Sequence, residues 1–168
     1  LAGVLSGNDS ARLQKTLVKT QQIAVNADAG YDAVTRGPGM FMVDATPAQG
    51  TSVAALEKAV RAEISRIQRE GISEAELTRV KAQVIAADVF QRDSLFYQAM
   101  QLGDYAMAGL PPEALARRVD KLRAVTAAAV QAAAQQWLQD DRLSVAELDP
   151  QPLQPKPRAA VPGVRHAN

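Results

Sequence analysis

Hydrophobic and polar residues alternate at the start of the stretch from Ile23 to Pro47. The apolar positions of the first arm are Ile23, Val25, Ala27, Ala29 and Tyr31. A period of two gives a strand with one apolar face and one polar face. A second apolar run, Met40 to Thr46, follows a link that contains Gly37, Pro38 and Gly39, a combination that favours a turn and excludes a helix. The pattern therefore predicts a β-hairpin.

The second arm of this hairpin is apolar on both faces apart from Asp44. Strands that are buried on both faces have near-continuous apolar runs of this kind. We therefore expect Met40 to Thr46 to lie in the interior of a sheet with both faces covered. A later apolar run, Leu143 to Leu148, predicts a further strand in the same sheet.

The remaining periodicity is helical, and its strongest segment is Ser52 to Glu70. Apolar residues recur there at spacings of three and four, with charged residues between them. Gly71 is suited to end this helix, and Ser73 with Glu76 forms a capping box that opens the next one. Because an unbroken helix to Ala108 would be about 54 Å long, we expect a break near Arg92, Asp93 and Ser94.

Shorter helical segments complete the pattern. Residues 1–22 predict an apolar turn that breaks at Gly7, followed by a helix that restarts after Asn8, Asp9 or Ser10. Further helices are expected over Glu113 to Ala124 and over Ala127 to Leu138, and Thr126 is suited to cap the last of them.

These elements predict the class of fold. Helices that cover one antiparallel sheet define an α+β domain, assigned to residues 1–149. Residues 150–168 hold five prolines and no acidic residue, which predicts a disordered tail.

Composition limits the classes of function. The net charge of +1 includes Lys156, Arg158 and Arg165, so residues 1–149 carry −2, which argues against a nucleic-acid partner. The chain has no cysteine, so disulfides and thiolate metal sites are excluded. The longest uncharged run, Ala124 to Gln139, is shorter than the ~20 residues that a membrane helix needs. Leu1 begins within an apolar segment without signal-peptide features, as expected for a fragment of a longer protein.

Few residues could carry chemistry. The only histidine, His166, lies in the Pro-rich tail, where a catalytic triad or histidine metal site would lack rigid support. Asp28, Asp32 and Asp44 lie on the hairpin and could form a cation site, but no loop there resembles a calcium loop, and a solvated sheet face explains them better.

Two further groups of residues have structural alternatives. Arg117, Arg118, Lys121 and Arg123 could contact phosphate, although the absence of interleaved aromatic residues favours a solvated helix face. The segment Tyr97 to Tyr105 could present aromatic and methionine side chains to a ligand. At helical spacing, packing in a core or an interface is the better interpretation.

Three segments, taken in order, resemble the insulinase/pitrilysin family of zinc metallopeptidases, which includes the mitochondrial processing peptidase. The first is the run DSARLQKTLVKTQQIAV from Asp9 to Val25. The second extends from Tyr31 through the Ser52 to Glu70 helix and ends with EGISEAELTRVKAQVIA. The third combines LRAVT, which begins at Leu122, with VQAAAQQWL and the closing segment LSVAELDP. The resemblance covers about Leu1 to Pro150. It implies one half-domain of the mitochondrial processing peptidase-like fold, in its C-terminal form that binds no metal.

The residues that would carry catalysis in this family are absent from the matching positions. The zinc motif H-x-x-E-H has no counterpart, because the chain has one histidine. Some members also carry a substrate-positioning Arg and Tyr in a Leu-Arg-x6-Tyr pattern; Val18 and Val25 stand there instead. We therefore predict no catalytic, metal-binding or cofactor-binding residue in this chain, with zinc held only by a partner half.

The resemblance implies a role in assembly and substrate enclosure. Two such halves enclose a chamber that binds an extended peptide, so this chain is expected to form one wall and to dock the metal-bearing half of the same polypeptide or a second subunit. The alternative is a scaffold or binding subunit with the same fold and no proteolytic role. Export, most simply to the periplasm, is favoured over a cytoplasmic location.

Overall fold

The structure is a computed structural model that describes residues 1–151. Along the chain the elements are α1 (Ala2–Leu5), the π-helix η1 (Gln14–Thr20), β1 (Ala24–Tyr31), β2 (Phe41–Pro47), α2 (Val53–Glu70), α3 (Glu74–Gln91), α4 (Leu95–Met107), α5 (Pro112–Ala116), α6 (Arg118–Ala124), α7 (Ala127–Trp137) and the 3-10 turn η2 (Asp140–Arg142). Helices and a small antiparallel sheet together make an α+β fold, as the sequence predicts.

The predicted hairpin is present as β1 and β2. The strands pair antiparallel, with Ala27 opposite Ala45 and Ala29 opposite Val43, and the register is irregular between Ala24 and Asn26. Such an irregularity is typical of a β-bulge, which adds a residue to one strand and increases its twist.

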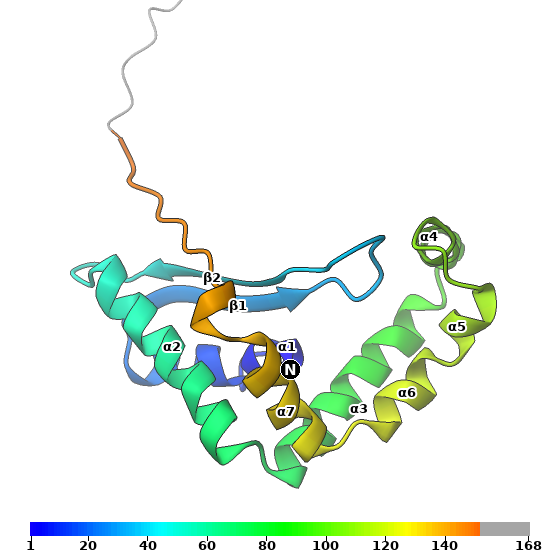
Figure 1. Cartoon of the computed structure of the whole chain (residues 1–168), viewed down its shortest axis with the longest axis horizontal. Helices are drawn as coiled ribbons and strands as arrows, with labels where there is room; N and C mark the ends of the chain where they lie inside the picture. Colours follow the sequence, from blue (N-terminus) through cyan, green and yellow to red (C-terminus); the bar gives the residue numbers. More distant parts are fainter. Residues whose placement is uncertain (152–168) are drawn as a thin grey trace, which may run out of the picture.

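Helices cover one face of this hairpin and leave the other face bare. Figure 1 shows α1, α2 and α7 on the lower side of the strands, with no helix directly above them. Residues from α1, η1, α2 and α7 pack with β1 in a single apolar core, whose fully enclosed members include Leu5, Leu17, Ala27 and Ile67. Ile23, Ala27 and Ala29 thus face the helices, as the alternation predicts. Val25 and Tyr31, predicted on the same face, are instead 66 and 53% exposed, and Val25 stands where the register is irregular.

The helix boundaries follow the capping signals in the sequence. The Ser52 and Ser73 hydroxyls accept hydrogen bonds from the backbone N–H groups of Ala55 and Glu76, at 3.2 and 3.1 Å. Gly71 ends α2 with φ 70° and ψ −153°, a backbone region that is essentially restricted to glycine. These are N-caps and a C-terminal stop of the expected kind.

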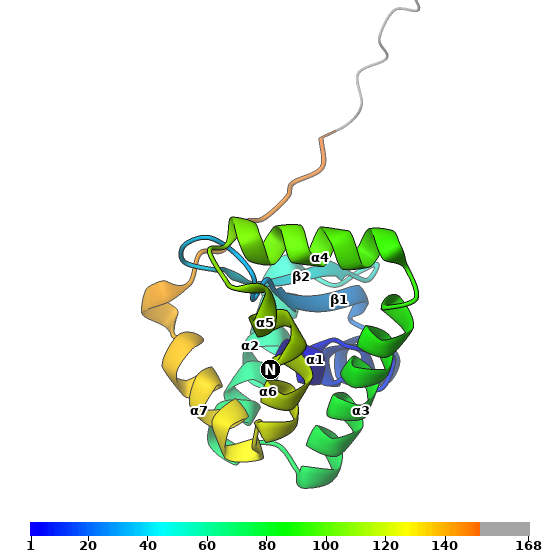
Figure 2. The ribbon, with the colours of Figure 1, turned by 90° about the vertical axis from the view of Figure 1, so that its right-hand side faces the viewer.

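The predicted break between α3 and α4 is also present. α3 ends at Gln91, and the Ser94 hydroxyl caps α4 by accepting from the Tyr97 N–H at 3.2 Å. The chain then turns, so that α4 lies across one end of the molecule and α5 and α6 return beside α3 (Figures 1 and 2). The segment expected as one helix from Glu113 to Ala124 is divided at Arg117 into α5 and α6.

Two predictions about the sheet are wrong for the described residues. β2 is not covered on both faces: Met42 is 57% exposed, and exposed and half-buried positions alternate along the strand. Residues 143–148 form no strand, and Leu143, Val145 and Leu148 are 48, 57 and 88% exposed. The described sheet has two strands, so β2 pairs with β1 alone. Its outer face is open because the described helices lie on the other side of the hairpin (Figure 1). The predicted tail lies almost wholly outside the described residues.

The restarted N-terminal helix differs from an ordinary α-helix. Residues 12 and 13 are α-helical, and Gln14 to Thr20 continue as a π-helix. Its Gln21 N–H donates to the Thr16 carbonyl at 2.8 Å, an i to i−5 bond. Leu13 and Leu17, the two apolar residues that suggested the helix, are both fully buried.

Candidate functional site

The three aspartates of the hairpin do not come together as one site. Asp28 and Asp44 stand directly opposite each other on adjacent strands, whereas Asp32 lies beyond the end of β1. Asp28 accepts a hydrogen bond from the Ser6 hydroxyl at 2.8 Å, and Asp32 accepts one from the Val34 N–H at 2.9 Å. Each of these two side chains thus has a local structural partner.

No arrangement of metal ligands is found within residues 1–151. That part of the chain contains neither His nor Cys, and it contains no group of three or more Asp or Glu residues placed to hold an ion. A peptidase zinc ion is held by nitrogen, oxygen or sulfur donors from three or more side chains. The described residues therefore do not fit a zinc ion, and His166 lies outside them.

The two positions matching the family's substrate-positioning pattern are apolar and close to the sheet. Val18 lies in η1 and packs against the core, while Val25 lies at the irregular end of β1 and is 66% exposed. Neither side chain can donate or accept a hydrogen bond. Together with Met42 on β2, Val25 makes the bare face of the hairpin partly apolar.

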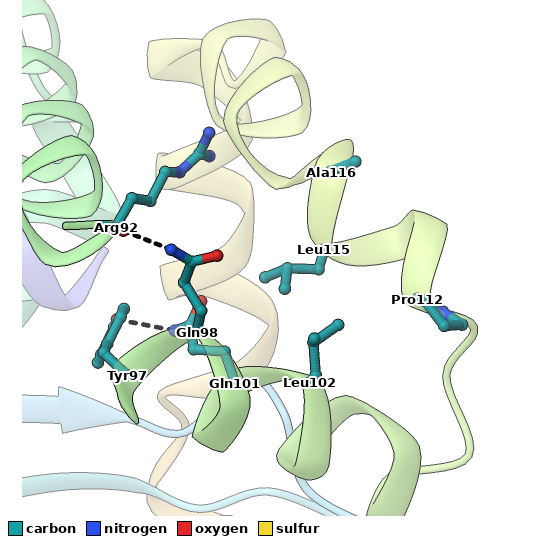
Figure 3. A pocket seen from close by; sticks show the side chains of 8 residues that line it. All are labelled: Arg92, Tyr97, Gln98, Gln101, Leu102, Pro112, Leu115 and Ala116. Carbon is teal, nitrogen blue, oxygen red and sulfur yellow. Dashed lines mark hydrogen bonds between the residues drawn. The ribbon is translucent and has the colours of Figure 1, made fainter. Parts of the chain in front are cut away.

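A cleft of about 270 Å³ lies between α4 and α5. Figure 3 shows its lining, which consists of Arg92, Tyr97, Gln98, Gln101, Leu102, Pro112, Leu115 and Ala116. The Gln98 amide donates to the Arg92 carbonyl at 2.6 Å, and the Gln101 amide donates to the Tyr97 hydroxyl at 2.7 Å. The cleft has no carboxylate and no nucleophile with a neighbouring base, so this lining supports binding and not catalysis.

The segment Tyr97 to Tyr105 is partly explained by this cleft. Tyr105 is 7% exposed and packs inward, while Tyr97 and Gln101 line the cleft. Met100 is 44% exposed on another side of α4. Packing within the chain therefore accounts for only part of the segment.

The four basic residues predicted as a solvated helix face lie on and beside α6. Arg118 is 3.8 Å from the Asp88 carboxylate, and Arg123 is 3.3 Å from that of Asp120. The Arg123 carbonyl also accepts a hydrogen bond from Lys81 at 2.7 Å. Arg117 separates α5 from α6, and Lys121 is exposed. These contacts agree with the surface interpretation.

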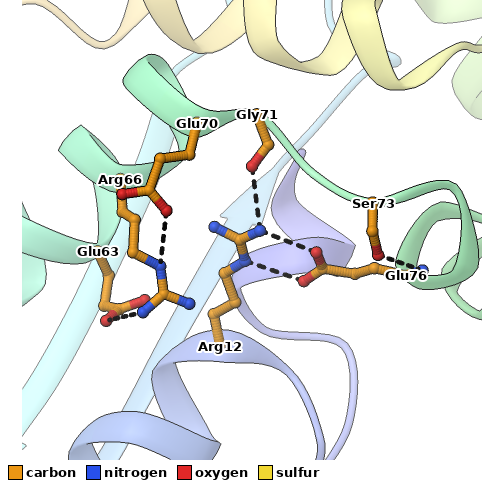
Figure 4. A network of polar contacts seen from close by, with 7 residues as sticks. All are labelled: Arg12, Glu63, Arg66, Glu70, Gly71, Ser73 and Glu76. Atoms are coloured by element: carbon orange, nitrogen blue, oxygen red, sulfur yellow. Dashed lines mark hydrogen bonds and ion pairs between the residues drawn. The ribbon is translucent and has the colours of Figure 1, made fainter.

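A partly buried polar network joins the N-terminal segment to the α2–α3 turn (Figure 4). Arg12 donates from Nε and Nη2 to the two carboxylate oxygens of Glu76, at 2.9 and 2.8 Å, and from Nη2 to the Gly71 carbonyl at 3.1 Å. These hydrogen bonds keep the pKa of the Glu76 carboxyl below its usual range. Nearby, Glu63 is 6% exposed and accepts from Arg66 at 3.3 Å.

Only the local part of this network could be predicted from the sequence. The motif Ser73-x-x-Glu76 predicts a capping box, in which the glutamate would turn back to the helix N-terminus. The serine acts as predicted, but the Glu76 carboxylate pairs with Arg12 instead. Because the two residues are 64 positions apart, no local pattern could reveal the contact.

The described residues form an α+β domain in which helices cover one face of an antiparallel hairpin (Figure 1). Residues 1–84 match the family described as the Peptidase M16 inactive domain, and the chain belongs to this family. This confirms the resemblance to the C-terminal, non-metal-binding domains of zinc metallopeptidases. No curated protein matches the sequence.

Three solved structures share the fold. The inactive peptidase domain of a protein described as a zinc protease from Bordetella parapertussis is 21% identical with a TM-score of 0.74, and the match covers 90% of this chain and 81% of that one. A protein described as a zinc protease from Bordetella pertussis is 21% identical with a TM-score of 0.71, covering 84 and 77%. A protease from Helicobacter pylori is 19% identical with a TM-score of 0.78, covering 84% of this chain and 34% of that one. This chain thus spans about a third of the Helicobacter protein.

Proposed function

We propose that this chain is the non-catalytic domain of a zinc metalloendopeptidase, where it forms one wall of a peptide-enclosing chamber and docks the metal-bearing half. The observation that carries the proposal is the family match to an inactive peptidase domain over residues 1–84. The coverage of about a third of a Helicobacter protease supports the view that such domains work within a larger protein.

The bare face of the hairpin is the surface proposed to line the chamber. Its exposed side chains include Val25 and Met42, at 66 and 57%, with the Asp28 and Asp44 pair between them along the strands. Apolar side chains offer an extended peptide nonspecific contact area, while the carboxylates can accept hydrogen bonds from its backbone or basic side chains. This mixture suits enclosure of varied peptides better than recognition of one small ligand.

Zinc chemistry is assigned to the partner half. The described residues contain no histidine or cysteine, and no group of carboxylates is placed to bind an ion. The absent motif H-x-x-E-H would supply both the ligands and the glutamate that activates water. In this chain the proposed contribution is therefore restricted to shape and contact with the peptide.

The first experiment measures zinc and peptidase activity of the purified chain. We expect no stoichiometric zinc after dialysis against a zinc-containing buffer, and no cleavage of an internally quenched, unstructured peptide. Stoichiometric zinc accompanied by cleavage would overturn the proposal. A His166→Ala variant is the control for adventitious metal, because His166 is the only histidine of the chain.

The second experiment tests the wall itself. NMR titration with the same unstructured peptide should shift the amide signals of Val25 and Met42. The affinity should be weak, because without the partner half the peptide contacts only one side of the proposed chamber. Val25→Glu should reduce these shifts, whereas Trp137→Glu on α7 should leave them unchanged. Shifts confined to the cleft between α4 and α5 would instead support a separate binding subunit without a role in proteolysis.

The location and the partners of the parent protein are part of the same proposal. No helix among the described residues is long and apolar enough to cross a membrane. Family resemblance leads us to propose export to the periplasm, and a partner that carries the zinc ion. Cell fractionation, followed by isolation of the native protein with its bound chains, tests both points.

A further inference from the structure

The outer side of α4 is apolar and has no partner within residues 1–151. Leu95, Phe96 and Met107 are 81, 78 and 74% exposed, and Phe90, at the end of α3, is 76% exposed. Figure 2 shows α4 extended across the near side of the molecule, while the cleft residues hold its other side against α5. Exposed apolar surface of this extent marks an interaction site in a folded protein.

The exposed side of α4 has large residues at its ends and small ones in its middle. Phe96, Met100, Gly103 and Met107 recur at spacings of four and three, so they lie along one side of the helix. Ala99 and Ala106 are exposed beside them. A partner helix could therefore approach the middle of α4 closely, while the large side chains at the two ends of α4 contact the partner helix on either side of this point.

Nothing within residues 1–151 requires residue 103 to be glycine. No neighbouring atom lies within 4 Å of the point where a Cβ atom would stand, and the residue lies inside a helix without a positive φ. Glycine at such a position costs roughly 0.5–1 kcal/mol relative to alanine. A close approach by another chain would use the space that the missing side chain leaves.

The sequence of α4 is complementary to itself when two copies pair antiparallel. With Gln101 at the centre, Phe96 lies level with Ala106 of the second copy, and Ala99 lies level with Gly103. Large side chains thus meet small ones at the flanks, and two small residues meet near the axis. Leu95 of each copy lies level with Met107 of the other, so apolar side chains also meet at both ends of the helix pair.

The proposed surface carries little charge. Asp104 is the only charged residue of α4, and Gln98, which lies level with it in the antiparallel pair, faces the cleft and donates to the Arg92 carbonyl. The two copies of Asp104 are then about 9 Å apart along the helix axes. Depletion of charge in the centre of the surface is typical of interfaces between identical subunits.

We propose that two copies of this chain associate through an antiparallel, two-fold symmetric pair of α4 helices. The exposed apolar side chains of α4 and the end of α3 offer on the order of 600 Å² per chain, close to the roughly 800 Å² per partner of a standard interface. Two-fold symmetry makes the same patch serve both chains. The dimer is independent of the peptidase role, since it uses neither the bare sheet face nor zinc.

The first test is the mass of the full chain in solution. Light scattering after size-exclusion chromatography should give twice the chain mass of 17.9 kDa at micromolar concentration. Phe96→Glu and Gly103→Leu should each raise the dissociation constant by roughly thirtyfold or more. The matched control is Leu148→Glu, because Leu148 is 88% exposed but far from α4 in sequence and should leave the dimer intact.

The second test fixes the direction of the two helices, and it uses a chain that contains no native cysteine. Met100→Cys should be joined by a short bismaleimide, since the two thiols stand about 3 Å apart along the axes. Ala106→Cys should not be joined, because the corresponding separation is about 15 Å. A monomer at all concentrations, a dimer that survives Phe96→Glu, or equal cross-linking at both positions would each overturn the proposal.

Discussion

Arg12 and Glu76, which are 64 positions apart in the sequence, meet through two parallel hydrogen bonds of 2.9 and 2.8 Å. Their side chains are only 12 and 16% exposed. Two-point pairing of this kind fixes orientation as well as distance. The contact ties the segment before β1 to the start of α3, on the side of the core away from the hairpin's bare face.

Replacing Glu76 by alanine should lower the free energy of unfolding by roughly 2–4 kcal/mol, because Arg12 would keep a poorly solvated charge without its partner. Urea denaturation followed by circular dichroism measures the change. Glu57→Ala is the matched control: its partner Arg61 is 40% exposed, so a loss of less than about 1 kcal/mol is expected. Equal losses in the two variants would contradict the assigned role.

The same pair makes stability depend on acid. Folding lowers the pKa of Glu76, chiefly through its hydrogen bonds with Arg12, so the unfolded chain takes up this proton at a higher pH than the folded chain. The stabilisation is therefore complete above the unfolded pKa of about 4.3 and is lost as the pH falls through the lower folded value.

This acid dependence can be measured by comparing wild type with Glu76→Gln. The difference between their urea midpoints should be constant from pH 7 to about pH 5 and should shrink at lower pH. A difference that grows on acidification would have the wrong sign for a depressed carboxyl pKa.

Gly71 is expected to resist substitution for a backbone reason. Its φ of 70° and ψ of −153° lie in a region almost closed to other residues, and an added Cβ would stand 3.0 Å from the Gln131 side chain. Gly71→Ala should therefore cost about 1–3 kcal/mol, measured by thermal unfolding. Gly30→Ala, in β1 with open space around the new Cβ, should change stability by less than about 0.5 kcal/mol.

α2 and α7 are joined by reciprocal side-chain amides. Gln68 donates to the Leu138 carbonyl at 2.8 Å, while Gln131 and Gln135 donate to the Gln68 carbonyl at 3.0 and 2.7 Å. Gln68→Ala should lower stability by about 1 kcal/mol and should increase hydrogen exchange in α7. Gln136→Ala is the control, because Gln136 is exposed on the same helix and its side chain makes none of these bonds. Unchanged exchange in α7 would show that apolar packing alone holds the helix.

Local signals in the sequence predicted the helices well. Ser52, Gly71, Ser73 and Ser94 each act within a few residues of their own position, so the boundaries of α2 and α3 and the break before α4 could be read without knowing the fold. The alternation of β1 likewise identifies Ala27 and Ala29 as facing the core, but it fails at Val25, where the register is irregular. Such features depend on backbone geometry that the chain specifies locally.

Sheet membership and the polar network could not be predicted in the same way. An apolar run such as residues 143–148 indicates capacity to form a strand, but a strand also needs a neighbour with free backbone groups. The open outer face of β2 and the π-helical turn at Gln14–Thr20 depend on which segments pack nearby. The absence of catalytic residues was inferred from residue types alone, and it stays a prediction until zinc and activity are measured.

Asp28 and Asp44 stand directly opposite each other on β1 and β2, so their carboxylates should repel at neutral pH. Like charges in such cross-strand pairs are destabilising, by roughly 0.2–1 kcal/mol. Asp44→Asn should therefore raise the free energy of unfolding at pH 7 by that amount, and 0.5–1 M salt should reduce the gain because it screens exposed charges. Asp32→Asn, beyond the end of β1, should give no comparable gain. A loss of stability in Asp44→Asn would mean that the carboxylate makes a favourable contact within the chain, and it would contradict the predicted repulsion.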